Sequence, residues 1–214
     1  MAAPATKAEQ AAFIEKMIAA IKAQPTLYGL LPSVIVAQAA LESGWGKSEL
    51  SRYNNLFGVK ASPTQYSAAW NPQSSRTVNL RTKEYDNGYN SEVATWRVYD
   101  TIADSITDRN ALVATNPRYS AALKVATPEQ QIQALKDGGY ATEPDYVRRV
   151  LSVINSSDLQ QYDTIEPESE KPMPALRFAF KNSNSKAAII AVSVAVVVAV
   201  VVTIAVILIK KRKK

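Results

Sequence analysis

The sequence has no cysteine and no histidine among its 214 residues. Without cysteine the chain forms no disulfide and has no thiolate nucleophile. Without histidine it has no Ser-His-Asp arrangement and no histidine-containing metal site. Any catalysis must therefore use carboxylates, tyrosine, lysine, serine or threonine, of which carboxylates are the natural candidates. We expect neither a metal nor a cofactor.

The net charge is also close to zero outside the last residues of the chain. The formal charge is +6, and residues 210–214, all Lys or Arg, carry five of those charges. Residues 1–186 are therefore close to neutral and lack the basic surface that marks nucleic-acid binding. We expect no nucleic-acid partner. The basic tail at 210–214 is more typical of a membrane stop that contacts anionic lipid.

Charge is absent altogether from residues 187–209, which are mostly Val, Ala and Ile. As a helix they would span about 34 Å at ~1.5 Å per residue, enough for a hydrocarbon core of ~30 Å. The pattern predicts one C-terminal transmembrane helix over 187–209, joined by a polar, proline-containing linker over 159–186.

The orientation of this helix is left open by the sequence. The basic tail favours a cytoplasmic C-terminus and so a preceding domain on the cell-wall side. However, four cations lie between residues 171 and 186, and the N-terminus shows no secretory signal. A phage lysis role, a specialised export system or an injected effector would each account for that combination.

Residues 7–158 show the periodicities of a mostly helical α+β domain. A change to period two at 78–84, the turn residues Asp86-Asn87-Gly88 and a return strand at 93–99 predict one β-hairpin. We therefore expect a helical lobe and a small hairpin lobe. Apolar spacing, caps and stop signals predict helices at 7–23, 32–43, 101–115, 127–138 and 142–156.

Glu42 lies at the predicted C-terminal end of the second helix. The negative end of the helix dipole and the apolar neighbours Leu41 and Trp45 both disfavour its ionisation. A raised pKa is what a proton-donating acid needs near neutrality. Position alone does not exclude an ordinary surface glutamate.

Glu84 ends the first predicted strand, on a face that it shares with Val78 and Leu80. A carboxylate there points toward the interior of the hairpin lobe and supplies the second acidic group that glycoside hydrolysis usually requires. A solvated strand-end charge is the alternative. Asp86 and Glu92 are nearby rivals, although Asp86 is better explained as a turn residue.

Six segments, in the same order along the chain, closely resemble motifs of glycoside hydrolase family 73. That family comprises bacterial endo-β-N-acetylglucosaminidases, including the flagellar-rod peptidoglycan hydrolase domain. The resemblance covers roughly residues 8–158, and several motifs in order are more specific than any one of them. The segments are 36–46 (Val-Ala-Gln-Ala-Ala-Leu-Glu-Ser-Gly-Trp-Gly), 55–61 (Asn-Leu-Phe-Gly-Val-Lys-Ala), 82–88 (Thr-Lys-Glu-Tyr-Asp-Asn-Gly), 96–99, 116–119 and 139–146.

The resemblance implies a lysozyme-like fold over residues 7–158. It matches Glu42 to the family's catalytic acid and Glu84 to its second glutamate, on the hairpin lobe. It also matches Tyr140 to a tyrosine that positions substrate near the acid, with a core tyrosine as the alternative. The match at Glu84 is the less secure, because the segment before it varies in length within the family.

Asn55, Phe57 and Tyr119 are further candidates for the substrate groove. Aromatic faces stack on sugar rings, and an asparagine can bond to an acetamido group. Each could instead serve packing or a turn, and for Phe57 packing is equally favoured. Trp45 and Trp96 are expected in the core.

The implied reaction is hydrolysis of the β-1,4 bond that follows N-acetylglucosamine in peptidoglycan, without metal or cofactor. Inversion or retention depends on a carboxyl separation of ~6.5–9.5 Å or ~5–5.5 Å. Two alternatives stay open. A lytic transglycosylase of the same fold needs one acid and leaves anhydro-sugar ends, and a catalytically silent glycan-binding module would only tether a membrane to the wall.

Overall fold

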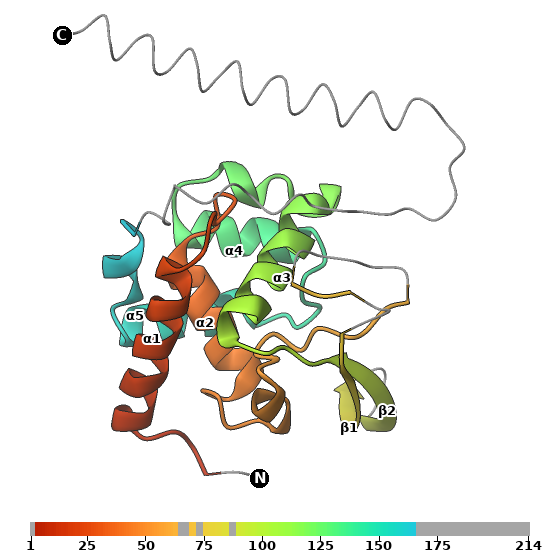
Figure 1. Cartoon of the computed structure of the whole chain (residues 1–214). Coiled ribbons are helices and arrows are strands. Elements are labelled where there is room, and N and C mark those ends of the chain that lie inside the picture. Colours follow the sequence, from red (N-terminus) through yellow and green to blue (C-terminus); the bar gives the residue numbers. More distant parts are fainter. Residues whose placement is uncertain (1–2, 64–68, 72–74, 86–88, 166–214) are drawn as a thin grey trace, which may run out of the picture. The chain divides into compact units, whose positions relative to one another are not determined.

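A computed structural model describes residues 3–63, 69–71, 75–85 and 89–165 of the chain (Figure 1). In the hairpin it describes side chains only up to residue 81 and again from residue 93. The predicted transmembrane helix, the basic tail and most of the predicted linker lie outside these ranges. Within them, no helix is both long enough and apolar enough to span a bilayer.

The helix α2 (Pro32–Ser43) forms the centre of the described domain. Ten of its twelve residues are buried, mostly small or β-branched ones that allow neighbouring helices to approach closely. It contacts α1 (Lys7–Lys22), α4 (Pro128–Asp137) and α5 (Tyr146–Ser156). A helix enclosed in this way holds its side chains rigidly, which matters for the residues at its C-terminal end.

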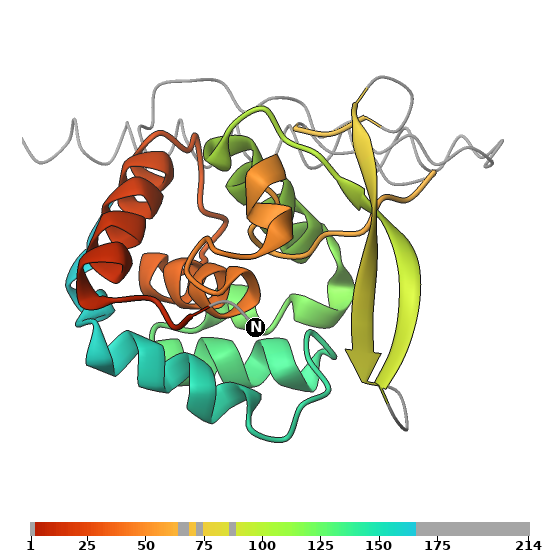
Figure 2. The same cartoon turned by 90° about the horizontal axis from the view of Figure 1, so that it is seen from below.

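The remaining helical elements complete the shell around this centre (Figures 1 and 2). The helix α3 (Ile102–Thr115) starts with a capping box, in which Thr101 and Asp104 satisfy each other's backbone N–H groups. In the described part of the chain, short 3₁₀ turns lie between or after these elements, at Glu49–Tyr53, Pro117–Tyr119, Ala122–Lys124 and Leu159–Tyr162. The predicted starts and ends of the first four helices are confirmed to within one residue.

The fifth helix, α5, begins at Tyr146 and not at 142 as predicted. Pro144 disfavours the helical conformation for the residue before it. The carbonyl oxygens of Glu143 and Pro144 instead accept hydrogen bonds from Lys136 Nζ at 2.8 and 2.6 Å. Residues 138–145 therefore form a loop that is tied to the end of α4.

The predicted hairpin is confirmed as β1 (Thr77–Tyr85) paired antiparallel with β2 (Tyr89–Arg97). The return strand begins four residues earlier than expected, because it pairs with the whole of β1, from Tyr85↔Tyr89 to Thr77↔Arg97. It also ends two residues earlier, since Tyr99 N donates to Tyr53 O and not to β1. The hairpin stands at one edge of the helical part (Figure 2).

The predicted linker starts too early at residue 159. Leu159 is fully buried, and the carboxylate of Asp163 accepts two hydrogen bonds of 2.8 Å from the backbone N and Oγ of Ser33. Asp163 thereby caps the N-terminus of α2, whose own N-cap residue, Leu31, provides no side-chain bond. Residues 159–165 belong to the folded domain, which is mostly helical with one small antiparallel sheet.

Candidate active site

Glu42 lies at the last turn of the buried helix α2. Gly44 ends the helix in the left-handed conformation, with φ of 57°, which glycine adopts without strain. Ser43 Oγ donates to Ala39 O at 2.5 Å and accepts from Gly46 N at 2.8 Å. These bonds fix the chain on the C-terminal side of Glu42, so the carboxyl projects from a rigid support.

The pKa of the Glu42 carboxyl is raised above its ordinary value of 4.5. The largest cause is desolvation by the protein around the carboxyl, although the side chain still reaches solvent. Repulsion by Glu143 adds to the rise, whereas Arg149 and Arg109 oppose it. The expected direction is confirmed, and the group is accessible, partly desolvated and biased toward its protonated form.

Glu143 is a second carboxylate of this site that the sequence interpretation missed. It belongs to the loop between α4 and α5, and its Oε2 pairs with Arg149 Nη1 at 2.6 Å. Both side chains are exposed, so water and salt screen the pair. No local pattern marks Glu143, because its influence on Glu42 arises only when the loop folds back toward the end of α2.

Three tyrosines form a contiguous cluster beside Glu42. The ring of Tyr140 lies 6.0 Å from that of Tyr119 and 6.1 Å from that of Tyr146, in edge and tilted arrangements. Burial raises the pKa of Tyr140, and the negative charge of Glu42 acts in the same direction. The Tyr140 phenol is therefore a neutral, half-buried group near Glu42, and its positioning role stays a prediction.

Tyr119 is buried, with 9 % of its surface exposed, and its ring packs closely over the loop that carries Tyr140. A Cβ atom on Gly138 would meet the Tyr119 ring and Arg118 O at 2.7 Å. Only glycine allows this approach. Tyr119 therefore supports Tyr140, and little of its own ring is available to a sugar.

Asn55 and Phe57 do not fit the groove contacts expected of them. Asn55 is 1 % exposed, and its amide bonds to the backbone of Val59 in both directions and to Arg97 O, each at 2.9 Å. Its hydrogen-bonding groups are thus committed to joining a loop to the hairpin. Phe57 is buried in the core and faces Arg109, so the packing interpretation holds for it.

Glu84 lies on β1, paired in register with Asn90 and one residue before the end of the strand. Its backbone is therefore on the hairpin, as predicted. Its side chain lies outside the described ones, and its role as the second carboxylate stays a prediction. The rival Glu92 lies on β2, and Asp86 falls outside the described residues.

A family model described as mannosyl-glycoprotein endo-beta-N-acetylglucosaminidase matches residues 18–159. The chain belongs to this glucosaminidase family. The match covers the helical part and the hairpin, and it agrees with the resemblance in the six sequence segments.

Relatives of this glucosaminidase domain include two bacterial enzymes. Peptidoglycan hydrolase FlgJ of Salmonella typhimurium is 42% identical over 132 residues, which are 59% of this chain and 39% of FlgJ. Exo-glucosaminidase LytG of Bacillus subtilis is 32% identical over 166 residues, 74% of this chain and 55% of LytG. The chain thus spans about two fifths to somewhat over half the length of these relatives.

Solved structures share the fold. The catalytic domain of the autolysin Auto from Listeria monocytogenes superposes with a TM-score of 0.63 at 31% identity, covering 76% of this chain and 92% of that one. The glycoside hydrolase domain of Salmonella typhimurium FlgJ gives a TM-score of 0.57 at 30% identity, with 71% and 90% covered. The lysozyme-like family fold expected from the sequence is thereby supported.

The glucosaminidase hairpin is anchored to the helical part by a buried ion pair. Arg97 Nη1 donates to both carboxylate oxygens of Asp108 on α3, at 2.9 and 2.8 Å, and neither side chain is exposed. Tyr99 Oη donates to the same carboxylate, and the Arg97 guanidinium lies 4.1 Å from the Trp70 ring centroid. This ion pair and the stacking on Trp70 therefore fix the end of β2 relative to α3.

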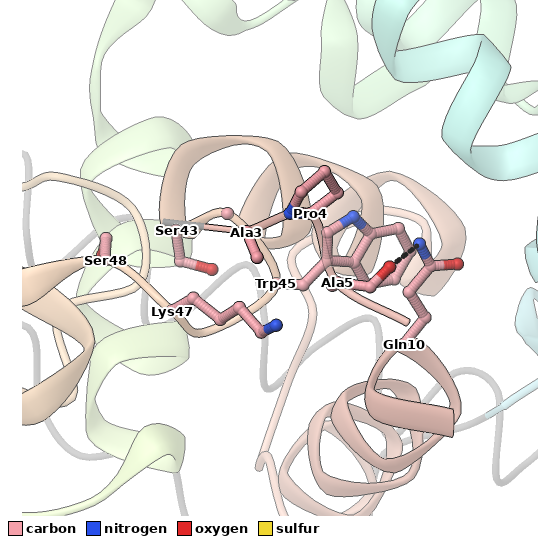
Figure 3. A pocket seen from close by; sticks show the side chains of 9 residues that line it. Ala3, Pro4, Ala5, Gln10, Ser43, Trp45, Lys47 and Ser48 are labelled. Atoms are coloured by element: carbon pink, nitrogen blue, oxygen red, sulfur yellow. Dashed lines mark hydrogen bonds between the residues drawn. The ribbon is translucent and has the colours of Figure 1, made fainter. Parts of the chain in front are cut away.

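A pocket of about 360 Å³ lies beside the C-terminal end of α2 (Figure 3). Its lining contains no acidic side chain and does not include Glu42. Trp45 packs edge-on against Phe13 there, at 5.8 Å, and Lys47 pairs with Glu9 at 2.7 Å. Trp45 thus serves packing, as expected.

Proposed function

We propose that this glucosaminidase hydrolyses the β-1,4 bond that follows N-acetylglucosamine in peptidoglycan glycan strands. The observation that carries the proposal is Glu42, a solvent-reachable carboxyl with a raised pKa at the end of a buried, rigid helix. A raised pKa favours the protonated form that a general acid needs, at a pH where an ordinary carboxyl is already ionised.

In this mechanism Glu42 gives its proton to the bridging oxygen while the bond from that oxygen to the anomeric carbon breaks. The electron pair stays on the oxygen, and Glu42 becomes a carboxylate. Glu84 is the second carboxylate, which activates water or attacks the anomeric carbon. Tyr140, held between Tyr119 and Tyr146, orients the sugar beside the acid.

The names of two relatives support the substrate class. FlgJ is a peptidoglycan hydrolase and LytG an exo-glucosaminidase, which also leaves open whether the attack occurs within the strand or at its end. The neutral charge of residues 1–186 fits a glycan whose recognition depends on stacking and hydrogen bonds.

Mass spectrometry of products from purified peptidoglycan tests the proposal. Hydrolysis after N-acetylglucosamine leaves that sugar at a new reducing end. A lytic transglycosylase leaves anhydro-sugar ends, which lack one water. A silent binding module releases nothing and produces no clearing on a peptidoglycan gel. Either of the last two results would contradict the proposal.

We also propose that residues 187–209 anchor the glucosaminidase to a membrane, with the domain on the cell-wall side. The support is the length of the uncharged run and the five cations that follow it. A glycan-cleaving domain on that side would have direct access to its substrate.

A further inference from the structure

Among the residues that the structure describes, Arg109 on α3 is a buried cation without a carboxylate in ion-pair contact. It is 2 % exposed, and within the described ranges it forms no ion pair. The buried Arg97 offers a contrast, since Asp108 accepts two hydrogen bonds from it. Burying a charge without a counter-ion is costly. An uncompensated guanidinium in the interior therefore requires an explanation.

The contacts of Arg109 replace a counter-ion with neutral groups. Its guanidinium donates to Gln38 Oε1 and, at 3.0 Å, to Asn110 Oδ1, while its buried Nε finds no partner in the described part of the chain. The charge lies over the rings of Phe57 and Tyr140, at 5.4 and 5.5 Å from their centroids. Such ring contacts stabilise a cation but leave its charge unneutralised.

These contacts lead directly to the acid. Gln38 precedes Glu42 by one turn of α2, and its Nε2 donates to Tyr146 Oη at 2.8 Å. Tyr140, the predicted substrate-positioning residue, is the ring that Arg109 covers. Arg109 is thus connected by one intervening side chain to the helix turn that carries Glu42 and directly to the tyrosine cluster beside it.

We propose that Arg109 is the internal counter-ion of Glu42, a positioning residue that stabilises the carboxylate formed when the acid has given up its proton. This inference rests on the proposed function. When Glu42 donates to the bridging oxygen, it gains a negative charge, which the positive charge of Arg109 favours. Because the Arg109 guanidinium is buried, its charge is screened less than that of an exposed arginine, so it stabilises the charged state of Glu42 during bond cleavage.

Other charged groups also face Glu42. Glu143 opposes its ionisation, Arg149 favours it, and the phenols of Tyr140 and Tyr146 are neutral. The two arginines differ in setting, because Arg149 is exposed and paired with Glu143 whereas Arg109 is buried. Salt screens the effect of Arg149 but hardly that of Arg109.

The test compares Arg109→Gln, Arg109→Lys and Asn110→Asp in the full chain in detergent. The pH dependence of kcat/KM gives the alkaline limb set by the acid. A ¹³C NMR titration of the Glu42 carboxyl gives its pKa without any need for activity. Arg148→Gln is the matched control, since Arg148 is an exposed arginine on α5 that pairs with Asp145. Arg149→Gln serves as the salt-sensitive comparison.

We expect Arg109→Gln to lower kcat on the order of 10–100-fold, less than the 10²–10³-fold loss of a donor that touches the reacting oxygen. Its alkaline limb and the Glu42 titration should both move to higher pH and stay there in 1 M salt. Arg109→Lys should keep the limb near that of the wild type. Arg148→Gln should change neither readout, and the shift of Arg149→Gln should fade in salt.

Asn110→Asp is a second variant that tests the proposal if Arg109→Gln does not fold. It places a carboxylate next to Arg109 in almost the same volume, so the guanidinium is neutralised without being removed. The Glu42 titration should again move upward. An unmoved or lowered titration in Arg109→Gln, or in Asn110→Asp, would overturn the proposal. Because NMR reads Glu42 directly, this failure is distinct from the loss of the proposed function, which the products report.

Discussion

At Glu42, the raised pKa that suits the proposed acid role is expected to lower the stability of the fold. In the unfolded chain its carboxyl ionises with an ordinary pKa, whereas the folded domain raises that pKa by desolvation and by the nearby Glu143. Above the raised pKa, Glu42 is ionised in the folded domain, and this partly desolvated charge lowers the free energy of unfolding. Below the ordinary value both states are protonated, and the cost disappears.

The first prediction follows from the loss of stability that ionisation of Glu42 causes. Glu42→Gln should be more stable than the wild type at neutral and alkaline pH, and the advantage should shrink as the pH falls toward about 4. Each kcal/mol corresponds to about 2–4 °C in Tm for a domain of this size. Thermal unfolding over a pH series measures it, with the exposed Glu15→Gln as control. An advantage that persists at low pH would contradict the electrostatic explanation.

The second prediction concerns the two charges that Glu42 faces from the loop and from α5. Glu143→Gln removes a repulsion and should move the alkaline limb of activity to lower pH. Arg149→Gln removes an attraction and should move it to higher pH at low salt. Profiles of kcat/KM measure both shifts, and limbs that move in the same direction would refute the assignment.

At this scale the sequence was informative only where the chemistry is local. The end of a helix and apolar neighbours predicted a raised pKa for Glu42. Glu143 and Arg109 were missed, because their effect depends on a loop and a helix that approach from distant parts of the chain. Asn55 and Phe57 were candidates for the groove, with packing or a turn as the alternative. A sequence motif does not show whether the amide is already hydrogen-bonded or the ring already buried.

Among the elements, the hairpin depends most on one buried interaction. Asp108 on α3 compensates Arg97 at the end of β2, and Tyr99 donates to the same carboxylate. No other buried pair among the described residues joins charges of opposite sign. If Glu84 acts from the hairpin, this anchor fixes the base of the lobe that carries it.

The third prediction is that Asp108→Asn destabilises the domain by about 3–5 kcal/mol, since Arg97 is left as an uncompensated buried charge. Urea unfolding measures the loss. The matched control is Asp100→Asn, because Asp100 pairs with Arg76 at 2.7 Å on the exposed surface. Its removal should cost no more than about 1 kcal/mol. Equal losses in the two variants would contradict a special role for the buried pair.

Element types were predictable from the sequence, but some boundaries were not. Caps and stop residues located the first four helices closely. The start of α5 was misplaced, because Lys136 draws the carbonyls of Glu143 and Pro144 away from the helix. The length of β2 is set by its pairing with β1, and the fold of residues 159–165 by the contact of Asp163 with Ser33. These are tertiary contacts, which local patterns do not contain.

For the whole molecule, the fourth prediction concerns the uncharged run at 187–209. The full chain should float with lipid vesicles and resist extraction by alkaline carbonate and by salt, since an apolar segment of this length spans a bilayer. A chain that ends at residue 186 should stay in the aqueous fraction. Release of the full chain by salt alone would show that only the basic tail binds the membrane.

The proposed hydrolysis depends on Glu42 as the proton donor. The release of new reducing ends from purified peptidoglycan tests this role most directly. Glu42→Gln keeps the size of the side chain and removes the proton. We expect the rate to fall by about 10²–10⁴-fold across the pH range, in a protein whose thermal unfolding shows an intact fold. A folded Glu42→Gln variant that releases reducing ends at near the wild-type rate would contradict the account.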